Sequence, residues 1–173
     1  MPSTFSLIFA LLCTLSNLAN AAGWEPVTTK KRPDCTAESP CRVMESNAVF
    51  EVIMNSQMRE GMKVMHEIEI KNLKNGSIEK YKVDEMNNIG EKEFFELSKI
   101  QLKEYAGLAL YAYNSAREGK AFYYFLYDAA KQKFVQSEST FPKLSYDPKV
   151  KAFVTPVEGS KYVVDKNLKL ISR

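Results

Sequence analysis

The sequence is poor in the residues on which enzyme chemistry usually depends. Its 173 residues include one histidine, His66, and contain no Gly-x-Ser-x-Gly, His-Glu-x-x-His or phosphate-cradling glycine motif. His66 lies on the apolar side of an alternating segment, where a core histidine is more common than a general base. Glu67 and Glu69 share the opposite side, and paired carboxylates can cleave glycosides. On a surface strand such a pair is usually solvated, so we expect a protein that is not an enzyme.

A long apolar run is also missing from the start of the chain. The run Leu7–Leu12 is much shorter than the roughly 20 residues that span a bilayer. It is followed by the small-residue step Ala19-Asn20-Ala21, and the first charged residue is Glu25. This order is typical of a secretory signal peptide, residues 1–21, although no Lys or Arg precedes the run. We expect an exported protein, periplasmic or secreted, without a transmembrane segment.

Cysteine is scarce, with three residues in the chain. Cys13 lies in the leader, and a lipid anchor there is the alternative to cleavage, disfavoured by the bulky Leu12 before it. Cys35 and Cys41 remain, and an even count in an exported chain predicts one disulfide. Their Cys-x5-Cys spacing has no further ligand nearby, which argues against zinc. We therefore expect no metal and no cofactor.

Neither sign of charge dominates the sequence. The formal net charge is +3, and the only basic triplet is Lys30-Lys31-Arg32. This is too little positive charge for a nucleic-acid partner. Apolar residues make up 45% of the chain and charged residues 26%, as in ordinary globular proteins. Without the leader about 150 residues remain, the usual size of one domain.

Most of the chain consists of short β-branched and aromatic runs separated by turn signals. Residues 22–46 contain three prolines and predict an irregular arm held by the disulfide, whereas residues 47–173 predict a single β domain. The pattern indicates a mostly β fold with little helix, an antiparallel meander arranged as a partial propeller, sandwich or barrel. Predicted strands are 48–54, 63–71, 98–103, 107–114, 121–127, 133–136, 151–155, 161–165 and 168–171, and 91–97 suits a short helical turn.

One hairpin is well defined by its sequence. Residues 63–71 alternate apolar and polar side chains, and Asn75-Gly76 follows them. This pair favours a type I′ turn, which needs positive φ at both positions. Folding about that turn predicts that Ile70 lies opposite Tyr81.

Aromatic residues gather on two consecutive predicted strands. Alternation gives both faces enough apolar surface to need covering, so packing between sheets is the first interpretation. A tyrosine-rich contact surface is the alternative. One predicted face carries Tyr111, Tyr113, Tyr123, Phe125 and Tyr127, and the other carries Leu108, Leu110, Phe122, Tyr124 and Leu126.

The loop between these two strands, Tyr113-Asn114-Ser115-Ala116-Arg117-Glu118-Gly119-Lys120, is the candidate binding segment. It offers two cations, a flexible glycine and a tyrosine at its base. An exposed hairpin loop without a function would have the same composition.

Three segments resemble a known family. Phe125–Val135 and Leu144–Pro148 are similar to the hairpin and turn of the bacterial periplasmic lysozyme-inhibitor and immunity family, which has a propeller-like β fold. In that family a Tyr-x-x-x-Thr-Lys-Gly loop enters the active-site cleft of a peptidoglycan-cleaving muramidase. Tyr113 and Gly119 match this loop, with Arg117-Glu118 in place of Thr-Lys. The resemblance covers about residues 98–150.

The family often carries a calcium loop before this strand. Here the corresponding stretch, residues 102–107, keeps only Glu104 and Gly107 of that pattern. A calcium ion takes about 6–8 oxygen ligands, so we expect no calcium in this chain.

The loop and the resemblance together predict an exported protein that blocks a cell-wall hydrolase by inserting a basic loop into its cleft. Arg117 or Lys120 would pair with the acid/base carboxylates of the hydrolase, and Tyr113 would brace the loop. One alternative is an envelope protein that binds a sugar or another small ligand through the aromatic face. A secreted enzyme is the other. The predicted partner-binding residues are Tyr113, Ser115, Arg117, Gly119 and Lys120.

Overall fold

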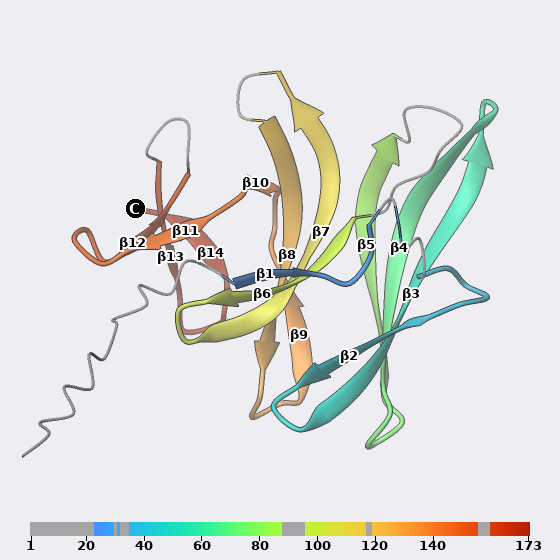
Figure 1. Cartoon of the computed structure of the whole chain (residues 1–173), viewed down its shortest axis with the longest axis horizontal. Helices are drawn as coiled ribbons and strands as arrows, with labels where there is room; N and C mark the ends of the chain where they lie inside the picture. The colour runs from blue at the N-terminus through green and yellow to red at the C-terminus, as the bar shows by residue number, and fades with distance from the viewer. Residues whose placement is uncertain (1–22, 30, 32–34, 88–95, 117–118, 156–159) are drawn as a thin grey trace, which may run out of the picture.

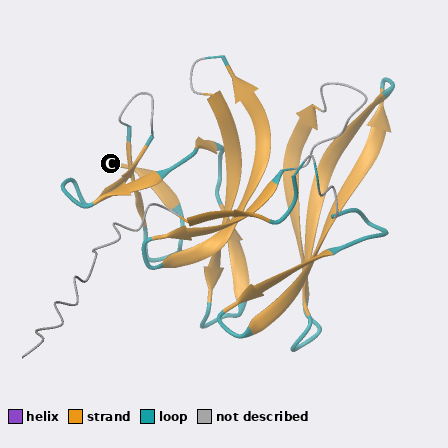
Figure 2. Ribbon diagram, in the orientation of Figure 1, coloured by secondary structure: helices purple, strands orange, loops and turns teal. Residues whose placement is uncertain are grey.

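The described part of the chain consists of strands and the loops between them (Figures 1 and 2). The computed structural model describes residues 23–29, 31, 35–87, 96–116, 119–155 and 160–173. These residues form three antiparallel sheets and contain no helix. The predicted antiparallel β meander is therefore confirmed. The helical turn predicted at 91–97 falls almost entirely outside the described residues, and β6 begins at its last position.

The central sheet runs in the order β1 (Gly23–Pro26), β6 (Leu97–Leu102), β7 (Tyr105–Ser115), β8 (Gly119–Asp128) and β10 (Phe141–Pro142), and β9 (Lys133–Gln136) also pairs with β8. The first outer sheet runs in chain order through β2 (Cys41–Glu45), β3 (Ala48–Arg59), β4 (Met62–Asn72) and β5 (Ile78–Asn87). The second outer sheet runs through β11 (Ser145–Asp147), β12 (Ala152–Val154), β13 (Lys161–Val164) and β14 (Leu170–Ser172).

Two hydrophobic clusters cover the two faces of the central sheet. The first joins Leu110 and Phe125 to Phe50 and Ile68 of the first outer sheet. The second joins β6, β7 and β8 to the second outer sheet and includes Ile100, Tyr124, Phe141, Phe153 and Leu170. The central sheet is thus the middle layer, as Figure 1 shows, with β2–β5 on one side and β11–β14 on the other.

The register of β7 against β8 corrects the predicted aromatic faces. At the hairpin end Tyr113 lies opposite Ala121, so odd numbers pair with odd numbers. The register then shifts between Tyr111 and Tyr113, and beyond this bulge Leu110 lies opposite Tyr123. Paired residues share a face of the sheet. The aliphatic residues of β7 therefore pack beside the odd-numbered rings of β8, because one inserted residue reverses the alternation.

The segment predicted to be an irregular arm contributes two strands. Trp24 of β1 pairs with Ile100 of β6, which places β1 at the edge of the central sheet. β1 is followed by Thr28, which is buried; its Oγ1 accepts a hydrogen bond from the backbone N–H of Leu97 at 2.7 Å. Alternation in such short segments is too brief to be recognised. β1 forms by pairing with β6, far along the chain, whereas β2 pairs with the strand that directly follows it, β3.

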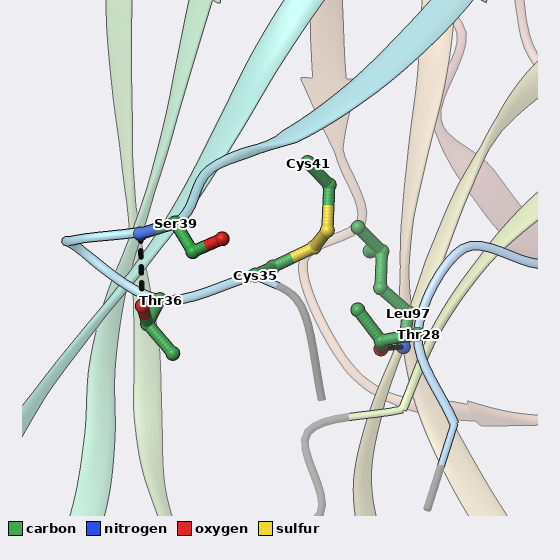
Figure 3. Close-up of a disulfide and its surroundings, with 6 residues drawn as sticks. All are labelled: Thr28, Cys35, Thr36, Ser39, Cys41 and Leu97. Atoms are coloured by element: carbon green, nitrogen blue, oxygen red, sulfur yellow. Dashed lines mark hydrogen bonds between the residues drawn. A yellow bond between two sulfur atoms is a disulfide. The ribbon is translucent and has the colours of Figure 1, made fainter. Parts of the chain in front are cut away.

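The predicted disulfide between Cys35 and Cys41 is confirmed (Figure 3). Their Cα atoms are 4.8 Å apart, and Cys41 is the first residue of β2. Within the loop, Thr36 Oγ1 accepts a hydrogen bond from the backbone N–H of Ser39 at 3.0 Å. Closing so short a loop stabilises the fold by about 2 kcal/mol in the chain-entropy description. It also ties the first residue of β2 to the loop that precedes it.

The hairpin between β4 and β5 forms, but its turn is not the predicted type I′ turn. Gly76 has positive φ, whereas Asn75 does not. Ile70 lies opposite Glu79 rather than Tyr81, a shift of two residues that keeps the buried face the same. Side-chain hydrogen bonds explain the longer loop: the Asn72 Oδ1 accepts from Lys74 N, and the Asn75 Oδ1 accepts from Ser77 N.

Tyr124 holds the chain where it passes from the central sheet to the second outer sheet. The residue is fully buried, and its hydroxyl donates to the carbonyl of Pro142 at 2.9 Å. The same oxygen accepts from the backbone N–H of Leu144 at 3.0 Å. Burial raises the pKa of the Tyr124 hydroxyl, so it stays protonated and keeps its donor role.

We expect Tyr124→Phe to lower the free energy of unfolding by about 1–3 kcal/mol, because the carbonyl of Pro142 and the N–H of Leu144 lose a buried partner. Urea unfolding measures the change. Tyr162→Phe is the matched control, because it keeps the ring that packs against Phe141 and removes a hydroxyl from a residue of β13 that is not fully buried, and surface changes usually stay within about 0.5 kcal/mol. Equal midpoints for Tyr124→Phe and the unsubstituted protein would contradict this account.

Candidate functional site

The end of the β7–β8 hairpin extends beyond its neighbours in the central sheet. The pairing of β6 with β7 stops at Leu97 and Leu110, and β10 reaches β8 only at Ala121 and Phe122. The last residues of β7 and the first of β8 therefore pair with each other alone among the described residues. Figure 1 shows this end at the top of the central sheet. We refer to residues 112–121 as the hairpin arm.

Tyr113 lies at the base of the hairpin arm, and half of its side chain is exposed (50%). Its hydroxyl lies 3.2 Å from the Oγ1 of Thr140, in the segment that leads into β10. The ring is thus presented to solvent while its hydroxyl is fixed to a neighbouring part of the central sheet. A rigid, amphipathic ring of this kind offers contact area at a low entropic cost.

Lys120 has a carboxylate partner within the protein. Its Nζ forms an ion pair with Glu96, the residue before β6, and lies 5.4 Å from the centre of the Tyr111 ring. The backbone N–H of Tyr111 donates to the carbonyl of Glu96 at 2.8 Å, which fixes Glu96 beside β7. Glu96 had not been recognised in the sequence, because it adjoins the arm only through the pairing of β6 with β7.

The structure places four of the five predicted binding residues at the hairpin end. Ser115 lies opposite Gly119 in the ladder, and Gly119 has a φ of 74°, which a residue with a side chain adopts only with strain. Farther from the tip, Lys120 lies opposite Asn114, and Tyr113 lies opposite Ala121. Arg117 lies outside the described residues.

The aromatic set proposed as an alternative ligand surface is largely core. A groove for a sugar would need Tyr111, Tyr123 and Tyr127 exposed to solvent. Tyr123 is 6% exposed and belongs to the first hydrophobic cluster, and Tyr127 packs against Phe50 with ring centres 5.4 Å apart. The rings therefore serve packing between sheets, and this set provides no open aromatic platform.

The two carboxylates considered for acid–base chemistry share one lysine partner on the outer face of β4. Lys80 Nζ lies 3.3 Å from Glu67 Oε1 and 3.0 Å from Glu69 Oε2. Asn55 also donates to Glu67 Oε1, at 2.9 Å. The Asn55 hydrogen bond and the Lys80 ammonium lower the pKa of Glu67 against the opposing effect of burial. A general acid at neutral pH needs a raised pKa instead.

Metal ligands of the usual kinds do not converge in the described part of the chain, where no three His, Cys, Asp or Glu side chains form a group that could hold an ion. Nor do the described residues include a helix with the length and apolarity of a membrane span.

Comparison of the chain with family models, with curated proteins and with solved structures finds no match.

We expect Glu67→Gln to destabilise the protein at neutral pH and to have less effect in acid. A carboxylate whose folded pKa is lowered contributes stability above the unfolded value of about 4.3, and this contribution is lost as the pH falls through the folded pKa. Urea unfolding between about pH 3 and pH 7 measures the difference. Glu38→Gln, at an exposed position of the disulfide loop, is the control. A Glu67→Gln difference that grows toward low pH would contradict the assignment.

Proposed function

We propose that this protein is an exported, non-catalytic binding protein that inhibits a peptidoglycan-degrading hydrolase by placing the hairpin arm in its cleft. The observation that supports this most directly is the arm itself, a two-stranded extension with an exposed tyrosine that is anchored at its base on both strands. On β7 the anchor is the Tyr113–Thr140 contact, and on β8 it is the ion pair of Lys120 with Glu96.

Anchoring matters because binding costs less when the binding segment is already ordered. Immobilising a flexible side chain or loop on binding costs about 0.5–1.5 kcal/mol per side chain. In the free protein, Tyr113 and Lys120 are already held by contacts to two other segments, so less ordering remains to be done on binding. Such an arm is suited to entering a cleft without being remodelled by it.

The charges of the arm divide into two roles in this proposal. Lys120 already has a carboxylate partner in Glu96, so it acts mainly by holding the arm in place. We therefore propose that Arg117 pairs with the acid/base carboxylates of the hydrolase. A guanidinium group can form two parallel hydrogen bonds with one carboxylate. Tyr113 contributes apolar contact area at the entrance of the cleft.

We expect Arg117→Ala to weaken inhibition far more than Lys120→Ala. Removing one partner of a buried charge pair typically costs about 2–5 kcal/mol, or roughly 30-fold and more in the inhibition constant. Lys120→Ala should cost only a few-fold, and Lys166→Ala, an exposed lysine in the turn before β14, should have no effect. The measurement is the clearing rate of a peptidoglycan suspension by a panel of muramidases, with each purified variant titrated in.

A protein that slows none of the muramidases, and that captures no cell-wall hydrolase from an envelope extract, would contradict the proposal. Equal inhibition by the Arg117→Ala variant and the unsubstituted protein would keep an inhibitory function but contradict the role given to the arm.

A further inference from the structure

The positive charge of the protein is concentrated in the second outer sheet. Residues 143–173, which include β11 to β14, contain seven Lys or Arg and three Asp or Glu. The remainder of the chain has 17 basic and 18 acidic residues, although the net charge of the whole is +3. Figure 1 shows this sheet at the left of the molecule. One small sheet therefore carries the basic excess of an otherwise almost neutral protein.

The register places two of these cations directly opposite each other. The pairing of Val163 with Ile171 continues along the ladder, because the backbone N–H of Arg173 donates to the carbonyl of Lys161 at 2.9 Å. Tyr162, between Lys161 and Val163, packs against the second hydrophobic cluster. Its two neighbours and their partners therefore lie on the outer face of the sheet. Both cations are exposed, and like charges directly opposite each other destabilise a sheet.

The turn between β11 and β12 adds two more cations. Nη1 of Arg173 donates to the carbonyl of Val150 at 3.0 Å. Val150 lies between Lys149 and Lys151, which are both exposed. The hydrogen bond therefore places this turn beside the Lys161–Arg173 pair. We refer to Lys149, Lys151, Lys161 and Arg173 as the basic cluster.

The basic cluster is not neutralised by ion pairs. Within the described part of the chain, none of its four side chains forms an ion pair with a carboxylate. The two described carboxylates of this sheet are engaged by backbone N–H groups in turns. Asp147 accepts from Lys149 N at 2.8 Å, and Asp165 accepts from the N–H groups of Asn167 and Lys169, each at 2.8 Å. The cluster thus keeps a positive excess that an anionic partner would relieve.

An apolar pair adjoins the basic cluster on the same face. Ile171 is 45% exposed and lies two residues from Arg173, and Val163, which is partly exposed, lies two residues from Lys161. Residues two apart on a strand share a face. Long basic side chains can lay their aliphatic stems along apolar surface and hold the charge beyond it. Apolar groups beside cations are the combination that binds at the interface of an anionic bilayer.

The size of this face also favours a bilayer over a protein partner. The four strands have three or four residues each, so the face measures roughly 10 Å by 15 Å. A stable protein complex buries about 800 Å² on each partner, far more than this face offers. Attraction to a charged surface acts over about 8–10 Å, so the cations do not have to converge on one point.

We propose that the outer face of the second outer sheet docks on a bilayer that contains anionic phospholipid. The basic cluster contacts the lipid phosphates, and Val163 and Ile171 lie at the boundary between headgroups and acyl chains. The proposal shares no residue with the hairpin arm and does not depend on the inhibitory function.

Vesicles that differ only in lipid charge test the proposal. The mature protein is mixed with vesicles of phosphatidylglycerol and phosphatidylcholine, or of phosphatidylcholine alone, and the bound fraction is measured by sedimentation. We expect binding to the anionic vesicles and none to the neutral ones. Raising the salt concentration should weaken binding, because salt screens the attraction between the lysines and the phosphates.

The variants change exposed side chains, so that the fold survives. Lys149→Gln/Lys151→Gln should weaken binding about 30-fold, or about fivefold per lysine, the equivalent of about 1 kcal/mol each. Lys74→Gln/Lys82→Gln is the matched control, because it removes the same charge from exposed positions on the far side of the central sheet. It should leave the affinity nearly unchanged. Ile171→Gln should weaken binding several-fold, because its apolar contact with the bilayer is lost.

Failure to bind the anionic vesicles would overturn the proposal. An equal loss in Lys149→Gln/Lys151→Gln and in Lys74→Gln/Lys82→Gln would do the same, because it would show attraction by net charge alone. As a second measurement, polyphosphate is titrated into the protein as a soluble anionic polymer. Vesicle binding that depends on Ile171, together with weaker binding of polyphosphate, supports the bilayer. Equal affinity for both, unchanged in Ile171→Gln, would assign the face to anionic polymers and overturn the proposal.

Discussion

The burial of β8 on both faces is the constraint from which the architecture follows. Five consecutive residues, Phe122 to Leu126, are each at most 6% exposed. A strand with one solvated face would alternate between buried and exposed positions. Here both faces carry large side chains, so the central sheet needs a cover on each side, and the two outer sheets provide it. The burial of this one strand on both faces thus requires the layered arrangement. The hairpin arm is the continuation of the same strand.

Polar contacts then fix how the layers sit on one another. Glu45 is 5% exposed and pairs with Lys99 of β6 at 3.2 Å, which ties the end of β2 to the central sheet. At the other edge of the same outer sheet, the Tyr81 hydroxyl donates to the carbonyl of Phe134 at 2.7 Å, between β5 and β9. The hydrophobic clusters bring the sheets together without specifying direction. Hydrogen bonds and ion pairs of this kind select one register among the packings that would bury similar area.

Local sequence signals predicted strands well and long-range pairing poorly. β9 begins and ends at the bounds predicted for it, 133–136. The disulfide was predicted from the even number of cysteines that follow the leader. β1 was missed because it forms only against the distant β6, and β2 was missed because the tight turn that joins it to β3 was not recognised. The prediction of a type I′ turn at Asn75-Gly76 was also wrong. The two-residue turn with positive φ at both positions is formed by Ser46 and Asn47. The hairpin end between β7 and β8 lies where the sequence predicted a loop, but its neighbours Glu96 and Thr140 were not predicted.

The same constraint limits where this protein can bind anything. Both faces of the central sheet are covered by the outer sheets, so its aromatic residues do not form an exposed surface for a ligand. Binding is therefore expected at the ends of the sheets and on their outer faces. On the outer face of β4, Lys80 already forms ion pairs with Glu67 and Glu69. The end of the β7–β8 hairpin is different, since a β-bulge lies beside Tyr113. A bulge breaks the alternation that packing imposes, so it can aim a side chain that the core does not need. The proposed hairpin arm begins where the β7–β8 register departs from the regular alternation that builds the fold.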